Sequence, residues 1–290
     1  MARAKLFAGA AIGLCYFLVS FILLGHRNTA SSVIAAREDI LKRSPCINCI
    51  IIAGGSNSIY GIRTGIVEDR LGLDTRAQGV VNVALWNEGF SFSSYFQWLS
   101  HLQLKPAVLI YSSAGFYSLN ESALSDGPRQ QLDGESLLSI FSSTRLITKL
   151  MGKDVLLRFD DHGDLANYRC SAQFDPIEFK PFDRRAADRF TKHIRALGGL
   201  YRGSLVYLRI PPAYISRNQR SDWIAYFGAL RKVFEEYKLA DQLLNFPPQI
   251  IVDKNKFCDS PLHVRREFGE VLSFELAHDI KAHVLHTIVP

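Results

Sequence analysis

The sequence lacks the features of a disordered, repetitive or nucleic-acid-binding chain. It has no low-complexity tract and no internal repeat, which excludes an extended disordered protein and a solenoid. Its net charge of +6 comes from basic residues scattered among acidic ones, and no nucleic-acid-binding motif occurs, so we expect no nucleic-acid partner. The 290 residues are 48% apolar and 21% charged, a composition typical of one large globular domain or two small ones.

Charge is also absent from a long segment near the N-terminus. Arg3 and Lys5 precede an uncharged apolar run from Leu6 to Leu24. About 20 apolar residues span a bilayer, whereas the apolar core of a cleaved signal peptide has about 7–15. The length favours a transmembrane signal anchor over residues 1–25, with a cleaved signal peptide as the alternative, and a polar helical stalk over residues 26–45.

The basic residues before this run predict the orientation of the chain. Lys and Arg are retained on the cytoplasmic side of a membrane helix, although His26 and Arg27 on the far side oppose this orientation. We therefore expect a single-pass protein of the inner membrane whose globular part lies in the periplasm.

Cysteine is scarce, and its placement limits the metal chemistry of the chain. Cys15 lies in the apolar run, while Cys46, Cys49, Cys170 and Cys258 form an even set that allows two disulfides in three possible pairings. The Cys46-x-x-Cys49 spacing also suits redox or zinc chemistry, but no second such pair completes a zinc site. We expect structural disulfides and no bound metal, with free thiols as the alternative and metal or redox chemistry as the least favoured interpretation.

Beyond residue 45, strand-like and helix-like segments alternate. Strands are predicted at 49–53, 80–85, 107–111, 204–210 and 249–252, and helices at 58–73, 92–102, 221–239 and 264–283. This alternation predicts an α/β domain over residues 46–290, a three-layer α/β/α sandwich with a mostly parallel sheet. Residues 118–200 do not continue this alternation of strands and helices, and we interpret them as an insertion in the same domain. Its segment RFDDHGD, 158–164, has carboxylates that suit a hard metal ion, although a solvated loop is the simpler interpretation.

A serine stands where the first predicted strand ends, in the segment IIIAGGSNSIYGI at residues 50–62. Ligands of parallel α/β sheets bind beyond the carboxyl ends of the strands. Glycines allow a sharp turn there, and the following helix presents free N–H groups. The segment fits either a turn with a capping serine or a nucleophile, Ser56, beside donors for an oxyanion.

A nucleophilic serine needs a base, usually histidine, and a carboxylate that orients the base. The chain holds eight histidines, so position must decide among them. His263 follows the last predicted strand in FCDSPLHV, and Asp259 lies four residues before it. A loop at this strand end would bring both side chains to the edge that carries Ser56. The alternatives are a turn or capping role for Asp259 and a surface position for His263.

Five segments, in order, resemble the blocks of the SGNH hydrolases, the family of GDSL esterases and lipases. GGSNSIYGI resembles the nucleophile block, and NVALWNEGFS resembles the block whose glycine, here Gly89, contributes an oxyanion N–H. KPAVLIYSS and SLVYLRIPP are similar to the third and penultimate strands, and DSPLHVRREFG to the block with the Asp and His. The resemblance covers about residues 49–117 and 203–283. It implies a flavodoxin-like fold and the roles of nucleophile, base and orienting carboxylate for the three residues above.

The sequence departs from the family pattern in three places. Gly55 replaces the usual Asp of the first block, and the last block has one extra residue between its Asp and His. SSAGF, residues 112–116, stands where the family has an oxyanion asparagine. Asn87 and Asn120 are the amides that could replace it.

These features predict an extracytoplasmic serine-dependent O-acyl esterase or acyltransferase, with acetyl as the expected group, a cell-surface or exported carbohydrate as substrate and no cofactor. Ser56 attacks the carbonyl, and the N–H groups of Ser56 and Gly89 with the Asn87 amide hold the oxyanion. The alternative is an inactive scaffold or binding subunit of an exopolysaccharide synthesis or export complex, with polysaccharide-biosynthesis proteins as partners. Hydrolysis and transfer differ only in whether water or a sugar hydroxyl accepts the acyl group.

Overall fold

The computed structural model describes residues 29–43, 46–73, 79–85, 92–102, 104–117, 159–166, 170 and 173–285. The membrane anchor predicted over residues 1–25 lies outside these ranges. Among the described residues, no helix has both the length and the apolar character needed to cross a membrane.

The centre of the fold is a parallel sheet with the strand order β2-β1-β3-β4. These strands are β1 (Ile50–Gly54), β2 (Val80–Asn82), β3 (Val108–Ser112) and β4 (Leu205–Arg209). Every residue of β1 and β3 is buried, as expected for strands covered on both faces. The register pairs Gly54 with Ser112 and Ser112 with Arg209, so the carboxyl ends of β1, β3 and β4 lie at one edge of the sheet.

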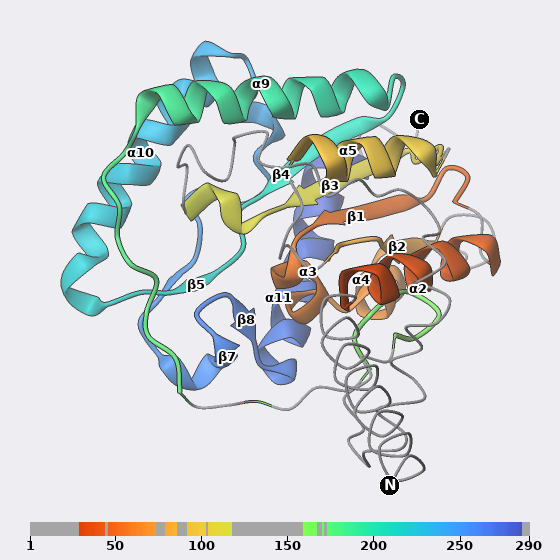
Figure 1. Cartoon of the computed structure of the whole chain (residues 1–290), viewed down its shortest axis with the longest axis horizontal. Helices are drawn as coiled ribbons and strands as arrows, with labels where there is room; N and C mark the ends of the chain where they lie inside the picture. Colours follow the sequence, from red (N-terminus) through yellow and green to blue (C-terminus); the bar gives the residue numbers. More distant parts are fainter. Residues whose placement is uncertain are drawn as a thin grey trace, which may run out of the picture.

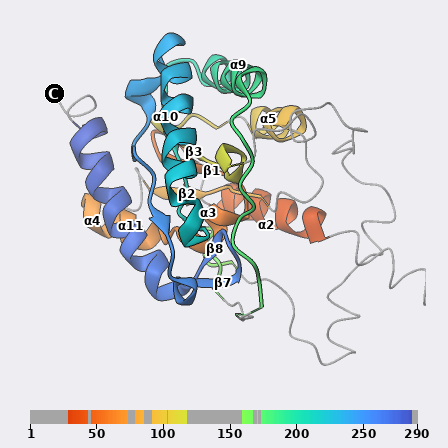
Figure 2. The same ribbon diagram turned by 90° about the vertical axis from the view of Figure 1, so that its left-hand side faces the viewer.

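Helices cover both faces of this sheet, which confirms the α/β class. The longer helices are α2 (Thr29–Arg43), α3 (Ser56–Gly61), α4 (Thr64–Leu71), α5 (Phe92–His101), α9 (Arg184–Leu200), α10 (Arg220–Glu236) and α11 (Arg266–Ile280). Figures 1 and 2 show α4 and α11 on one side of the sheet and α5 and α9 on the other. Alternate residues of β1 belong to different cores, with Ile52 facing α4 and α11, and Ile51 facing the α5 and α9 side.

Short elements complete the described fold. Two small sheets are present, β5 (Ala213–Tyr214) with β6 (Ile250–Ile251) in parallel and β7 (Phe257–Ser260) with β8 (His263–Val264) antiparallel. Single turns of helix lie at η1 (Ala114–Tyr117), η2 (Arg217–Gln219), η3 (Ala240–Gln242), η4 (Lys254–Lys256) and η5 (Lys281–Leu285). The hairpin of β7 and β8 lies next to α3, which places its turn at the carboxyl end of β1 (Figure 1).

The single helix predicted over 58–73 is wrong, because the structure has two helices, α3 and α4, separated by extended backbone at Ile62. Other elements satisfy the backbone groups at the break. The Thr64 N–H donates to the Asp164 carboxylate at 2.5 Å, and the N–H of the preceding residue donates to the Ser273 hydroxyl at 2.7 Å. These partners are distant in the sequence, so helical periodicity alone did not reveal the break.

Helix α2, inside the predicted stalk, packs against the domain. Arg37, Ile40 and Leu41 are buried. The Arg37 Nε donates to the Ala84 carbonyl at 3.1 Å, and its guanidinium lies 4.1 Å from the centre of the Phe159 ring. A buried arginine needs such partners because its charge cannot be neutralised at ordinary pH.

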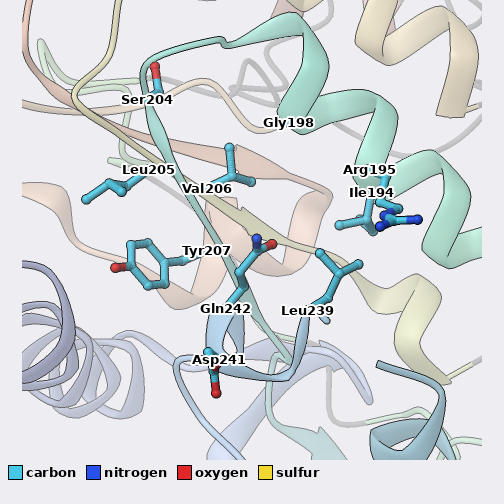
Figure 3. Close-up of a pocket in the computed structure, with 10 residues that line it drawn as sticks. All are labelled: Ile194, Arg195, Gly198, Ser204, Leu205, Val206, Tyr207, Leu239, Asp241 and Gln242. Carbon is cyan, nitrogen blue, oxygen red and sulfur yellow. The ribbon is translucent and has the colours of Figure 1, made fainter. Parts of the chain in front are cut away.

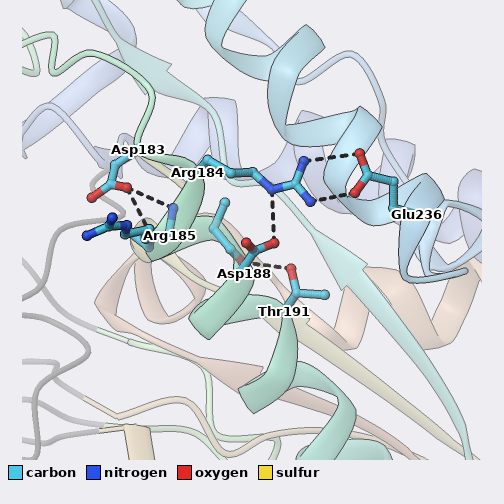
Figure 4. Close-up of polar contacts among 8 residues, drawn as sticks. Asp183, Arg184, Arg185, Asp188, Thr191 and Glu236 are labelled. Atoms are coloured by element: carbon cyan, nitrogen blue, oxygen red, sulfur yellow. Dashed lines mark hydrogen bonds and ion pairs between the residues drawn. The ribbon is translucent and has the colours of Figure 1, made fainter.

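Helix α9 forms part of the regular helical layer, although it falls within residues 118–200, where the predicted alternation of strands and helices is interrupted. The Asp183 side chain caps its first turn by accepting two backbone N–H bonds. Arg184 then joins α9 to α10 through a forked contact with Glu236 and also donates to Asp188 at 3.0 Å (Figure 4).

The four cysteines beyond the apolar run form the disulfides Cys46–Cys49 and Cys170–Cys258. The first closes a short turn before β1. The second joins residues 88 positions apart and is attached to β7. The structure therefore selects one of the three possible pairings.

Candidate active site

The turn after β1 requires glycine at its first position. Gly54 has φ +136°, and a Cβ built there would lie 1.7 Å from the Ser112 carbonyl oxygen of β3. The Gly54 N–H donates to the Tyr95 hydroxyl at 2.8 Å, and the Gly55 N–H donates to the Ser112 carbonyl at 3.2 Å. The two glycines let the chain pass tightly over the end of β3 and begin α3 at Ser56.

Ser56, His263 and Asp259 form a continuous chain of hydrogen bonds. The Ser56 Oγ lies 2.8 Å from the His263 Nε2, and the His263 Nδ1 lies 2.7 Å from the Asp259 Oδ1. The histidine side chain is 11% exposed and the aspartate side chain 31%, and the serine is partly exposed, so the histidine is the most buried member of the three. The structure thus brings the three predicted residues together, while their catalytic roles stay a prediction.

The β7–β8 hairpin explains how the last block tolerates its extra residue. Asp259 lies on β7, His263 begins β8, and Ser260 pairs with His263 across the hairpin. The His263 N–H donates to the Ser260 hydroxyl at 3.1 Å, which closes the turn. The turn therefore accommodates the additional residue, and both side chains still point to the same edge of the sheet.

Of the N–H and amide groups predicted to hold the oxyanion, the structure describes the Ser56 N–H. The Ser56 N–H belongs to the first turn of α3, where N–H groups have no partner within a helix. Asn87, Gly89 and Asn120, the other predicted or alternative donors, lie outside the described residues. The segment SSAGF, residues 112–116, ends β3 and begins η1, and it has no amide side chain where the family pattern has an asparagine.

Three polar residues that the sequence analysis did not single out support this site. Asn57, directly after the serine, donates to the Ser112 hydroxyl at 3.1 Å. Asn82 donates to the Ser58 carbonyl at 3.2 Å and so fixes α3 against the end of β2. Tyr60 stacks on the triad histidine. Its position four residues after the serine, on the same helical face, was the signal available in the sequence.

The Asp160 and Asp164 carboxylates of the segment RFDDHGD bond backbone N–H groups. Among the described residues, no group of three or more His, Cys, Asp or Glu side chains is arranged to hold a metal ion. The Asp160 Oδ1 accepts the His162 and Asp164 N–H groups at 3.0 and 2.9 Å. The solvated-loop interpretation is wrong for Asp164, which is 4% exposed and whose burial raises its pKa to about 6.

Two cavities lie beside β4. One of about 530 Å³ is bounded by α9 and the strand edge, with Tyr207, Leu239 and Asp241 in its wall (Figure 3). The other, of about 520 Å³, has Arg209 and Asp279 in its wall. Neither is lined by the residues of the hydrogen-bonded triad, among the parts of the chain that the structure describes. The cavities therefore do not mark this site, which rests on the geometry of its side chains.

Neither a protein-family model nor a curated protein sequence matches the chain. Solved structures similar to it include a family two carbohydrate esterase from Clostridium thermocellum in complex with cellohexaose, at 10% identity and a TM-score of 0.42, with 82% of this chain and 65% of that one covered. A carbohydrate esterase family 2 enzyme from Corynascus thermopiles is 12% identical, with a TM-score of 0.43 and coverage of 83% and 68%. TesA is 12% identical, with a TM-score of 0.40 and coverage of 81% and 99%.

Two of these three structures are carbohydrate esterases. The chain spans less than two thirds of the length of the Clostridium enzyme. At TM-scores below 0.5, similarity of this kind assigns neither a family nor an activity.

Proposed function

We propose that the chain is a divergent SGNH-type enzyme, a serine-dependent O-acyl esterase or acyltransferase. The observation that carries this proposal is the hydrogen-bonded chain from Ser56 through His263 to Asp259. The two ring nitrogens of the histidine have separate partners, an acceptor carboxylate and a hydroxyl. This arrangement sets the tautomer with the proton on Nδ1, so that the lone pair of Nε2 accepts the serine proton.

The chemistry follows from these positions. Ser56 Oγ attacks the acyl carbonyl while His263 Nε2 takes the hydroxyl proton, which gives a tetrahedral oxyanion and an imidazolium. The imidazolium returns that proton to the alkoxide leaving group, and an acyl-serine remains. Water or a sugar hydroxyl then attacks the acyl-serine and gives its proton to His263. The bond between the acyl carbon and the Ser56 Oγ breaks, and His263 returns that proton to the Oγ, which releases the free acid or the acylated sugar. Asp259 stays ionised throughout and orients the imidazole.

Backbone N–H groups of Ser56 and Gly89 are the proposed oxyanion donors, with the Asn87 amide as a third. One such donor contributes about 100- to 1000-fold in rate. An inactive scaffold or binding subunit is the second candidate function. It is favoured by the segment SSAGF at residues 112–116, because this segment has no amide side chain where the family pattern has an asparagine.

The substrate and location follow from the sequence resemblance and from the apolar N-terminal run. We propose an acylated cell-surface or exported carbohydrate as substrate, with acetyl as the acyl group. The proposed location is the periplasmic side of the inner membrane, with residues 1–25 as anchor and polysaccharide-biosynthesis proteins as partners. The predicted disulfides are present as Cys46–Cys49 and Cys170–Cys258, which suits an oxidising compartment.

The experiment is labelling of the full chain with a fluorophosphonate probe, followed by peptide mass mapping. Such probes react with a serine whose base and oxyanion donors are assembled. We expect the label on Ser56 and no labelling in Ser56→Ala. His263→Ala should label about 100- to 10,000-fold more slowly, because the general base is lost.

His278→Ala is the matched control, since this histidine is exposed on α11 and belongs to no part of the triad. Its labelling rate should equal that of the wild type. Absence of labelling in folded wild-type protein would contradict the enzymatic proposal and favour the scaffold. Labelling that survives in His263→Ala at the full rate would contradict the proposed base.

A further inference from the structure

A tyrosine lies flat against the triad histidine. The rings of Tyr60 and His263 are 4.1 Å apart between centroids and 1° from parallel. Tyr60 is 3% exposed and lies on α3, the helix that begins at Ser56. The nucleophile and the stacked ring therefore come from the same six-residue helix, one turn apart.

The phenol oxygen of this tyrosine also reaches the triad. The Tyr60 hydroxyl donates to the Asp259 Oδ2 at 3.4 Å, while the Oδ1 of the same carboxylate lies against His263. Both oxygens of the aspartate thus have a partner. The contact is long, as catalytic hydrogen bonds often are without substrate.

We propose that Tyr60 is a positioning residue that holds the His263 ring and the Asp259 carboxylate in the orientation in which both hydrogen bonds of the Ser56–His263–Asp259 chain form. This inference rests on the proposed function for its catalytic meaning. The imidazole must present Nδ1 to one partner and Nε2 to another, so a rotation of its ring breaks both bonds. A parallel ring at van der Waals distance blocks that rotation, and the hydroxyl blocks rotation of the carboxylate.

The ring of Tyr60 is itself fixed by its surroundings. It packs in a buried cluster with Ile59, Ala84, Leu165 and Cys258, and Phe159 packs against this cluster. Elements distant in sequence therefore meet around the tyrosine, and one of them, β7, is tied through Cys258 to Cys170 by a disulfide. A ring packed in this way can act as a rigid support for the histidine.

Two variants separate the ring from the hydroxyl. Tyr60→Phe keeps the stacked ring and loses the bond to Asp259, so the fluorophosphonate labelling rate should fall about 5-fold, the effect of one ordinary hydrogen bond. Tyr60→Leu removes the flat support, and the rate should fall about 100-fold, the cost of a misplaced catalytic group. Tyr201→Leu is the control, because that tyrosine is buried and bonds the Leu99 carbonyl at 3.1 Å on the other face of the sheet.

The decisive measurement does not depend on activity. The low-field proton NMR signal of the His263 Nδ1–H, held by Asp259, should be present in wild type, Tyr60→Phe and Tyr201→Leu. It should be lost in Tyr60→Leu, because the freed ring exchanges its proton with water.

Persistence of this signal in folded Tyr60→Leu, or its absence from the wild type, would overturn the proposal. If Tyr60→Leu does not fold, a labelling rate in Tyr60→Phe equal to the wild-type rate overturns the role of the hydroxyl. If the wild type shows the signal but is not labelled, the proposed activity fails while the positioning role of Tyr60 stands.

Discussion

The turn that presents the serine makes Gly54→Ala the most informative single substitution for the fold. A methyl group at this position would lie 1.7 Å from the Ser112 carbonyl oxygen and 2.7 Å from its carbon. An ordinary contact needs about 3.4 Å, so β3 would have to retreat from β1 by well over 1 Å. The same carbonyl accepts the Gly55 N–H at 3.2 Å and the Ser58 hydroxyl at 3.3 Å, and this movement would weaken both bonds.

The expected loss of unfolding free energy has three parts. The φ of +136° is strained for any residue with a Cβ, at about 1–3 kcal/mol. Overpacking in a rigid core adds about 1–3 kcal/mol, and weakened hydrogen bonds add about 1 kcal/mol. Gly54→Ala should therefore lose about 3–7 kcal/mol, a large fraction of the 5–15 kcal/mol that stabilises a typical domain.

Urea denaturation followed by fluorescence measures this loss as a lower midpoint with an unchanged slope. Gly65→Ala is the matched control, because that glycine is helical and a Cβ there would meet nothing within 4 Å. The control should stay within about 1 kcal/mol of the wild type. A loss below about 1 kcal/mol in Gly54→Ala, with an unchanged rate of serine labelling, would refute the close approach of β1 and β3 at this turn.

Two other predictions concern the buried Asp164 carboxyl and the two disulfides. Burial raises the pKa of Asp164 from 3.8 to about 6. The protonated carboxyl therefore contributes about 3 kcal/mol to the free energy of unfolding. This contribution is fully present below about pH 4 and is lost as the pH rises through about 6. Asp164→Asn should flatten that part of the pH dependence in urea unfolding at pH 4 and 7, and an unchanged dependence would contradict it. The double substitution Cys170→Ala and Cys258→Ala opens a loop of 88 residues and should lower the free energy of unfolding by about 4–5 kcal/mol. The double substitution Cys46→Ala and Cys49→Ala opens a loop of only 3 residues and should lower it far less. Equal thermal midpoints for the two variants would contradict this prediction.

The sequence contained enough information to predict the sheet and the meeting of the triad. Buried parallel strands are continuous apolar runs, which the sequence shows at β1 and β3. The carboxyl ends of parallel strands share one edge, so we expected a serine after β1 to meet a histidine that follows the strand predicted at 249–252. That strand, β6, pairs with β5 outside the central sheet, and the β7–β8 hairpin beside α3 brings His263 to Ser56. Ser56, Asp259 and His263 were found from this rule together with the family's block order, and spacing alone would not have selected one histidine among eight.

The features that were not predicted depend on contacts between distant segments. The break at Ile62 exists because Asp164 and Ser273 satisfy the freed backbone groups. The burial of Asp164 depends on the same packing, and so does the position of Arg37 against Ala84. Helical periodicity reports the local preference of a segment, and it carries no information about which remote side chain will replace a lost backbone bond.

The departures from the family pattern differ in their physical consequences. The extra residue between Asp259 and His263 lies in the turn of a hairpin, where length can change while the strand ends stay fixed, and both triad distances remain within hydrogen-bond range. The segment SSAGF at residues 112–116 is different, because none of its side chains has an amide N–H to donate to an oxyanion. Ser56, His263 and Asp259 therefore have the hydrogen bonds that acid–base chemistry needs. The rate of any reaction there depends on the remaining donors, so the labelling rate of Ser56 measures how well they replace the missing amide.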